Sequence, residues 1–247
     1  MNIIVHGSTG HMGRIVCDLA ENGFAGAEGV IKVGRSAAND PSSNTYSSLG
    51  AYSGQADVVI DFSNHASVSE LLAYCVERSL PVVIATTGHT PEEKAKITAA
   101  AEKIPVFYAA NMSVGVAVLA DLAKRAAAMF PNADIEILEM HHNRKLDAPS
   151  GTALMLAESI RSVRPDAEFV LGRSGSGKRK QNEIGISALR MGNEVGTHEI
   201  FISTGSETIT LKHEAENRSL FAEGALTAAA FVCGQQPGLY NMQDILA

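Results

Sequence analysis

The sequence predicts an α/β protein of two domains. The first is built on a parallel sheet wound with helices, and the second is an α+β domain with a mixed or antiparallel sheet. In the first half of the 247-residue chain, short apolar strands alternate with helical segments, which is the pattern of a doubly wound parallel sheet. Beyond residue 112, a long helix precedes a group of strand-like segments. With 45% hydrophobic residues, the chain can bury one large core or two modest ones.

The strands expected in the first half are short and apolar. They cover Ile3–Val5, Gly29–Val33, Val58–Ile60, Pro81–Ala85 and Val106–Tyr108. Helical spacing of apolar residues over Ile15–Leu19 and Leu71–Val76 predicts helices after the first and third strands. Thr90–Glu93 begins another helix, because a capping Thr precedes Pro and two acidic residues. No regular structure is assigned to the Ser- and Asn-rich segment 36–54.

The second half predicts a different order of elements. These are a helix over Val114–Met129, a strand over Asp134–Met140, a helix from about Gly151, and strands over 184–190, 199–204 and 207–214. Gly205-Ser206 suits a two-residue hairpin turn between the last two strands. The Ala-rich helix Leu220–Cys233 is expected to return to the first domain. The predicted domains are therefore 1–112, completed by 218–247, and 113–217.

Charge and composition narrow the classes of function. The net charge of −7 argues against general nucleic-acid binding, which needs a basic face. No apolar run is long enough to cross a bilayer, and the chain starts directly with a strand-like segment. The three cysteines, Cys17, Cys75 and Cys233, are widely spaced in apolar surroundings, so buried thiols in a reducing compartment are expected. We therefore expect a cytoplasmic protein without a nucleic-acid or membrane partner.

Three glycines follow the first predicted strand and open the first helix. Gly7, Gly10 and Gly13 have the spacing Gly-x-x-Gly-x-x-Gly, which differs from the commoner Gly-x-Gly-x-x-Gly. Glycine there lets the backbone approach a pyrophosphate, and the helix N-terminus supplies amide donors. A tight turn without a ligand is the alternative. The order of strand, loop and helix favours a Rossmann-type dinucleotide-binding domain.

The end of the second strand bears on the choice of dinucleotide. An acidic residue that binds the ribose is expected there, but the sequence has Lys32 and Arg35. Two cations suit a 2′-phosphate better than a bare 2′-hydroxyl, although a solvated basic turn is the alternative for either one alone. The sequence predicts NADPH, with NADH possible.

The run Glu139–Thr152 places two histidines, two cations and a Pro-Ser-Gly-Thr turn in one strand-to-helix connection, a kind of segment that often carries functional residues. His141 and His142 alternate in direction if the strand continues, which argues against both rings binding one metal ion, and no cysteine lies near. We therefore predict no metal site. Imidazole is a natural general acid near neutral pH, and the ammonium of Lys145 can pair with a carboxylate or assist protonation.

The same run ends in a predicted helix start. Ser150 is a good N-cap, which leaves the amides of Gly151 and Thr152 as free donors. A simple capped helix is the alternative, but beside Lys145 the arrangement suits a carboxylate. The candidate donors for a second carboxylate are His142, Arg218 and the cluster Lys178–Lys180.

Taken together, these motifs resemble dihydrodipicolinate reductases, which act in lysine biosynthesis. The run Glu139–Thr152 is similar to the signature of that family nearly residue for residue, and Gly7–Gly13 is similar to its cofactor loop, with His11 in place of the usual Arg. Further similar segments are Asp61–Ser63, Ala85–Gly88 and Tyr108–Gly115, the last of which resembles a hinge of the family.

The resemblance implies roles for individual residues. His141 would donate a proton, His142 and Lys145 would contact substrate or donate a proton, and Gly151 and Thr152 would bind a substrate carboxylate. The implied cofactor-binding residues are Gly7, Ser8, Thr9, Gly10, His11, Met12, Lys32, Arg35, Phe62, Ser63, Ala85, Thr86, Thr87, Ala109, Ala110, Asn111 and Met112.

The implied reaction is hydride transfer from the nicotinamide to a cyclic imine dicarboxylate, in a homotetramer assembled through the sheet of the second domain. Two other classes are considered. A sensor that binds cofactor without turnover would lack the second-domain motif, and a metal-dependent hydrolase would need a third ligand, for which the sequence has no candidate at suitable spacing.

Overall fold

The structure is a computed structural model that describes residues 1–246. These residues form two compact units. The first unit is Met1–Ser113 together with the chain from Arg218 onward, and the second is Val114–Asn217. Each unit has its own sheet and its own hydrophobic core. No helix in the described residues is long and apolar enough to cross a membrane.

The first unit contains a parallel sheet that follows the predicted pattern. Its strands are β1 (Asn2–His6), β2 (Gly29–Val33), β3 (Thr45–Tyr46), β4 (Val58–Asp61), β5 (Val82–Ile84), β6 (Pro105–Tyr108) and β12 (Gly238–Tyr240). Their order across the sheet is β12-β6-β5-β4-β1-β2-β3, and every pairing is parallel. The winding reverses between β1 and β4, and ligands of such sheets bind at the carboxyl ends of the strands beside this point.

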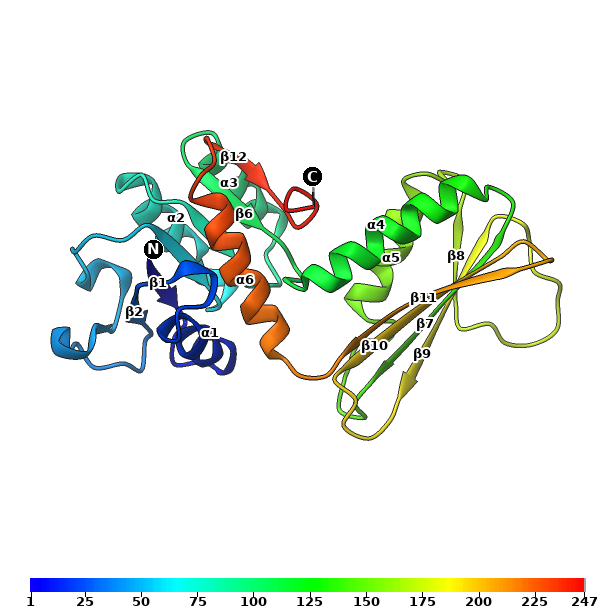
Figure 1. Ribbon diagram of the computed structural model, residues 1–247, viewed down its shortest axis with the longest axis horizontal. Coiled ribbons are helices and arrows are strands. Elements are labelled where there is room, and N and C mark those ends of the chain that lie inside the picture. The colour runs from blue at the N-terminus through cyan, green and yellow to red at the C-terminus, as the bar shows by residue number, and fades with distance from the viewer. Residues whose placement is uncertain (247) are drawn as a thin grey trace. The chain divides into compact units, whose positions relative to one another are not determined.

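Four α-helices accompany this sheet in the described residues (Figure 1). They are α1 (His11–Glu21), α2 (Val68–Glu77), α3 (Pro91–Ala101) and α6 (Ser219–Val232). The predicted start of α3 is confirmed, because Thr90 and Glu93 form a reciprocal capping box. Helix α6 packs against α1 and against β4, β5 and β6, as expected for a segment that returns to the first domain.

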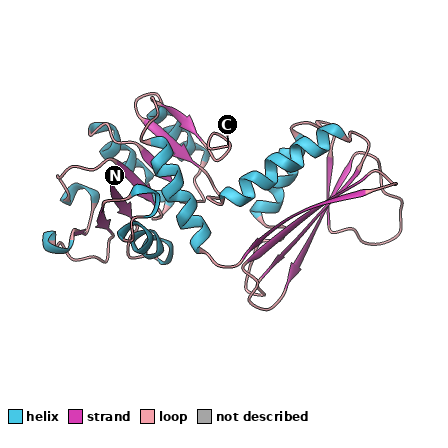
Figure 2. Ribbon diagram, viewed as in Figure 1, coloured by secondary structure: helices cyan, strands magenta, loops and turns pink. Residues whose placement is uncertain are grey.

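The second unit is a mixed five-stranded sheet with two helices on one side (Figures 1 and 2). Its elements are α4 (Val114–Met129), β7 (Asp134–His141), α5 (Gly151–Arg161), β8 (Glu168–Leu171), β9 (Glu183–Arg190), β10 (Gly196–Ser203) and β11 (Thr208–Ala215). The strand order is β11-β10-β7-β9-β8, in which β7 pairs in parallel with β9 and antiparallel with β10. The predicted α/β fold class with a second, mixed-sheet domain is confirmed.

Alternation along β7 explains how its residues are distributed. Ile135 and Ile137 are buried and pack into the core beneath the two helices.

The predicted turn at Gly205-Ser206 joins β10 to β11, and Gly205 has a φ of 92°, which glycine adopts without a steric penalty.

Some expectations differ from the structure. Cys17 and Cys75 are buried thiols as predicted, but Cys233 is exposed because it lies at the C-cap of α6, where that helix leaves the core. Strands β3, β8 and β12 were not expected from the sequence. They are two to four residues long and lie at the edges of their sheets, so they carry little apolar signal and depend on pairing with a neighbouring strand.

Candidate functional site

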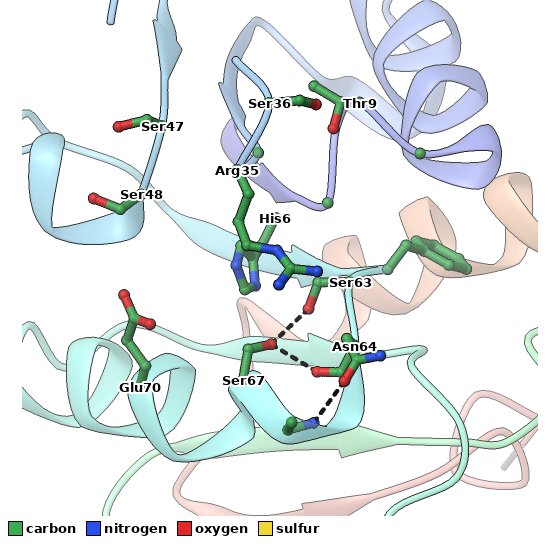
Figure 3. A pocket seen from close by; sticks show the side chains of 15 residues that line it. His6, Thr9, Arg35, Ser36, Ser47, Ser48, Ser63, Asn64, Ser67 and Glu70 are labelled. Atoms are coloured by element: carbon green, nitrogen blue, oxygen red, sulfur yellow. Dashed lines mark hydrogen bonds between the residues drawn. The ribbon is translucent and has the colours of Figure 1, made fainter. Parts of the chain in front are cut away.

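A cavity of about 590 Å³ lies at the carboxyl ends of the strands of the first unit. It is lined by His6, Gly7, Thr9, Gly10, Gly34, Arg35, Ser36, Ser47, Ser48, Phe62, Ser63, Asn64, Ala66, Ser67 and Glu70. These residues come from the segments that follow β1, β2 and β4 and from the segment after β3 (Figure 3). The cavity therefore lies where the winding of the sheet reverses.

The glycine loop packs closely around this cavity. Gly7 has a φ of 88°, and a Cβ atom there would lie 2.5 Å from the carbonyl oxygen of Phe62. A Cβ atom on Gly13 would lie 2.1 Å from the carbonyl oxygen of Gly7. Gly10 is the N-cap of α1, has no side chain to cap the helix and lines the cavity, so the first amides of α1 have no side-chain cap at that position. The geometry suits a phosphate group at this helix N-terminus.

A buried carboxylate joins three of the strand ends. Asp61 is 1% exposed and accepts hydrogen bonds from His6 Nδ1 at 2.8 Å, Ser63 Oγ at 2.6 Å and Thr86 Oγ1 at 2.6 Å. These contacts fix the ends of β1, β4 and β5 relative to one another. Sequence reasoning did not place His6 or Asp61 among the site residues, although a carboxylate that ends a fully apolar strand was a usable signal.

The two cations predicted for the cofactor differ in position. Arg35 lines the cavity, and Figure 3 shows its guanidinium group extended toward Ser63. Lys32 does not line the cavity, and its Nζ atom pairs with Glu21 Oε1 at 2.6 Å. This hydrogen bond to Glu21 raises the pKa of Lys32 above its ordinary value.

The other residues predicted to contact the cofactor do not line the cavity. They are Ser8, His11, Met12, Ala85, Thr86, Thr87, Ala109, Ala110, Asn111 and Met112. Thr86 is held by Asp61, and the side-chain oxygen of Asn111 accepts a hydrogen bond from the Ser113 amide at 2.8 Å. Met112 is buried against α6, where a Cβ atom on Gly224 would lie 1.7 Å from the Met112 carbonyl oxygen.

A second polar cluster lies in the second unit, where the buried face of β7 carries ionisable side chains at the C-terminal end of the strand. Glu139 and His141 continue the face of Ile135 and Ile137 and are 0% and 9% exposed. His141 Nδ1 lies 2.6 Å from Glu139 Oε2. His142 follows the strand, is half-buried, and donates its backbone N–H to the Glu194 carbonyl oxygen at 2.8 Å.

Glu139 is the centre of this cluster. Its two oxygens accept hydrogen bonds from Arg190 Nη1 and Nη2, both at 2.8 Å, and from the Ser150 amide at 2.9 Å, in addition to His141. Burial alone would raise the pKa of Glu139, but hydrogen bonds from His141, Arg190 and Ser150 hold it at about 2. Glu139 is therefore ionised at neutral pH.

A third histidine lies beside His141. The ring of His198 on β10 meets that of His141 edge to face, with 5.2 Å between centroids, and its Nε2 is 3.2 Å from Ser150 Oγ. Burial, and then the charge on His141, lower the pKa of His198 to about 4. Sequence reasoning missed Glu139, Arg190 and His198 as site residues. Arg190 and His198 carried no local signal, because they are distant from His141 in sequence.

In the connection from β7 to α5, Lys145 binds the carboxylate of Asp147. Lys145 Nζ pairs with Asp147 Oδ1 at 2.9 Å. This contact, with a further contribution from the backbone N–H of Gly151, lowers the pKa of Asp147. The predicted N-cap is confirmed, since Ser150 Oγ accepts from the Ala153 amide at 3.2 Å. The Gly151 amide, predicted as a free donor, contributes to the lowered pKa of Asp147, and its binding of a substrate carboxylate stays a prediction.

The remaining candidate donors are placed elsewhere. Arg179 donates to the carbonyl oxygens of Ile135 and Glu183, so its role is to fasten a loop to the sheet. Arg218 belongs to the first unit, where it precedes α6, and Thr152 lies in the first turn of α5. Across residues 1–246, no group of three or more His, Cys, Asp or Glu side chains is arranged to hold a metal ion.

Comparison with known proteins covers the whole chain. Residues 1–112 match the family model described as dihydrodipicolinate reductase, N-terminus, and residues 115–246 match its C-terminus. A 4-hydroxy-tetrahydrodipicolinate reductase of Caldanaerobacter subterraneus subsp. tengcongensis is 45% identical over 257 residues, which covers 100% of this chain and 98% of the relative. The enzyme of that name from Clostridium tetani is 41% identical, with 100% and 97% covered.

The fold agrees with these similarities. A dipicolinate-bound dihydrodipicolinate reductase from Paenisporosarcina sp. TG-14 has a TM-score of 0.80 and 27% identity, and 99% of each chain is covered. Both halves of the chain match one family, in the same order and over nearly their full length. The chain therefore belongs to the dihydrodipicolinate reductase family.

Proposed function

We propose that this protein reduces 4-hydroxy-tetrahydrodipicolinate to tetrahydrodipicolinate with a reduced nicotinamide dinucleotide, in the pathway to diaminopimelate and lysine. Its family makes it an oxidoreductase that uses NAD(P)H. The observation that carries the proposal is the carboxylate held by Lys145 and the start of α5, in the same connection as His141. The related structure with bound dipicolinate supports a dicarboxylate as the ligand.

Within this proposal, the first unit holds the dinucleotide and the second holds the substrate. The cavity after β1, β2 and β4 is large enough for part of a dinucleotide, and the N-terminus of α1 offers amides to its phosphates. The bound nicotinamide would supply the hydride. Arg35 supports NADPH over NADH, because it lines the cavity and its guanidinium group could pair with a 2′-phosphate.

Residues of the second unit supply charge and a proton. A substrate carboxylate would take the place of the Asp147 carboxylate at Lys145, Gly151 and Thr152, and His142 would bind the second carboxylate. His141 would deliver the proton that completes the reduction, and Lys145 would assist it electrostatically. No step in this scheme needs a metal ion.

The proposal extends to the oligomeric state of the protein and to its cellular compartment. The face of the second sheet opposite α4 and α5 carries half-exposed apolar side chains such as Leu138, Met140 and Phe201. Association of copies through this face would bury them, which supports a homotetramer assembled by residues 113–217. Three cysteines without a disulfide suit a reducing compartment, and we place the protein in the cytoplasm.

Turnover of the proposed substrate tests the proposal directly. Purified protein is mixed with NADPH and the freshly generated cyclic imine, and the absorbance of the reduced nicotinamide is followed. We expect the absorbance to fall only when all three components are present. A protein that binds the cofactor without oxidising it would be a sensor and not a reductase, and this outcome would contradict the proposal.

A further inference from the structure

The residues around His141 fix the orientation of its imidazole ring. Its Nδ1 atom faces Glu139, while its other ring nitrogen, Nε2, lies 3.0 Å from the place that a Cβ atom on Gly196 would occupy. The perpendicular ring of His198 packs against it. The imidazole therefore has a defined orientation, with one nitrogen bonded and one that makes no hydrogen bond to any residue in the described range 1–246.

Glu139 also determines which nitrogen carries a permanent proton. An ionised carboxylate only accepts hydrogen bonds, so Nδ1 must be the donor in the 2.6 Å contact. Neutral His141 then has its lone pair at Nε2, and protonated His141 has its second N–H there. Only Nε2 can gain and lose a proton without breaking the bond to Glu139.

Arg190 keeps this arrangement in place. Both of its terminal nitrogens bond to Glu139, and the Ser150 amide completes the set of donors around a side chain that is fully buried. Besides Glu139, the titratable group packed against His141 is His198 on β10, and Arg190 on β9 pairs with the same Glu139 carboxylate. Lys145 in the loop after β7 and His213 on β11 act electrostatically on His198. Lys145 is itself paired with Asp147.

We propose that Glu139, fixed by Arg190, is a positioning residue that holds Nδ1–H of His141 and so makes Nε2 the nitrogen that delivers the proton. This inference rests on the proposed role of His141. In the reduction, the substrate gains a hydride from the cofactor and a proton from Nε2–H of the imidazolium. The ring is left neutral with Nδ1–H still donated to Glu139, and water restores the proton at Nε2.

The substitution Glu139→Gln tests this because it preserves shape but removes the charge. We expect kcat to fall on the order of 10²-fold with little change in KM, because the wrong tautomer becomes accessible. The alkaline limb of the pH–kcat profile should move to lower pH, since the imidazolium loses its anionic partner. Glu139→Asp should restore part of kcat.

Glu136→Gln is the matched control, because Glu136 lies on the same strand, is 42% exposed and pairs only peripherally with Arg179 at 3.7 Å. It should leave kcat and the pH profile unchanged. A Glu139→Gln variant with wild-type kcat and pH profile would overturn the inference, while a normal kcat in His141→Ala would instead overturn the proposed function.

Nitrogen NMR of histidine-labelled protein provides a readout that does not depend on activity or on the folding of a variant. In the wild-type protein with the His141 ring neutral, we expect a single Nδ1–H tautomer for this residue. The Nε2–H tautomer, or a mixture of both, would contradict the inference even if Glu139→Gln proved too unstable to assay.

Discussion

At the scale of single residues, His141 and Lys145 are four positions apart but have different surroundings. His141 is 9% exposed and bonded to a buried carboxylate, whereas the Lys145 side chain is 22% exposed and pairs with Asp147 near the surface. The first environment suits controlled proton transfer, and the second suits binding of an exchangeable anion.

We predict that His141→Ala and Lys145→Ala each reduce kcat by about 10²–10⁴-fold, because a positioned proton donor contributes on that order. The affinity for NADPH should be unchanged, since neither side chain belongs to the first unit. Steady-state kinetics and cofactor titration measure both quantities. Lys124→Ala, at an exposed position of α4, is the control. Near-normal turnover in both active-site variants would exclude this assignment.

The two cations of the first unit should contribute unequally to cofactor choice. Arg35→Ala is expected to weaken NADPH binding more than NADH binding, because Arg35 lines the cavity. Lys32→Ala should have the smaller effect, because Lys32 is already paired with Glu21. The preference should also shrink at high salt. Calorimetric titration of both cofactors at two salt concentrations checks this, and a preference for NADH in the wild-type protein would refute it.

Asp147 is expected to compete with the substrate for Lys145. Asp147→Asn removes the charge that now occupies Lys145 and the start of α5, so pyridine-2,6-dicarboxylate should inhibit the variant at concentrations roughly two- to fivefold lower, the range of an exposed ion pair. The inhibition should be competitive with the substrate in both proteins. Asp121→Asn removes a comparable surface pair with Arg125 and should have no effect. Weaker inhibition of Asp147→Asn would mean that Asp147 orients Lys145 instead.

At the scale of elements, strand β7 and the start of α5 depend on buried ionisable groups. Glu139 bonds to the N-cap residue of α5, and that residue bonds in turn to His198 on β10. The pKa values of Glu139 and His198 are held at about 2 and about 4, both below their ordinary values of 4.5 and 6.5. Protonation of either group therefore favours the unfolded chain.

Acidification should weaken the second unit in two successive windows. Because the unfolded chain binds more protons than the folded one, stability is lost from about pH 6.5 to pH 4 through His198, and from about pH 4.5 to pH 2 through Glu139. Thermal melting across these pH values measures the loss. His198→Asn should reduce the loss of stability in the first window, because the Asn amide can bond to Ser150 without titrating. A melting temperature that rises as the pH falls from 6.5 would contradict the prediction.

At the scale of the whole molecule, the chain passes between the two units twice, after Ser113 and before Arg218. Hydride transfer requires direct contact between the nicotinamide and the substrate. If each unit binds one ligand, the ternary complex needs both units in one defined arrangement. The segment Asn111–Ser113 and the residues around Arg218 are the proposed hinges.

We predict that small-angle scattering shows compaction only when NADPH and pyridine-2,6-dicarboxylate are both bound. Either ligand alone contacts one unit strongly and should leave the distribution of dimensions nearly unchanged. Scattering from the free, singly liganded and doubly liganded protein separates these states. Identical radii of gyration in all of them would rule out closure around Asn111–Ser113.

The sequence by itself determined the elements and their chemistry where the signal is local. The glycine loop, the capping box at Thr90, the N-cap at Ser150 and the period of the strands are set by neighbouring residues, so they could be predicted. The signature run was sufficient to place His141 and Lys145 in one connection. It was also sufficient to indicate the family.

Only the tertiary structure decided the partners of those residues. Arg190 and His198 reach Glu139, Ser150 and the ring of His141 because β9 and β10 flank β7 in the sheet, and no local pattern encodes that pairing. In the same way, Lys32 could be recognised as a cation, but its bond to Glu21 depends on how α1 packs on β2. Sequence spacing fixes which side chains are available, whereas hydrogen bonds and burial, which set their charge and orientation, arise from contacts between distant segments.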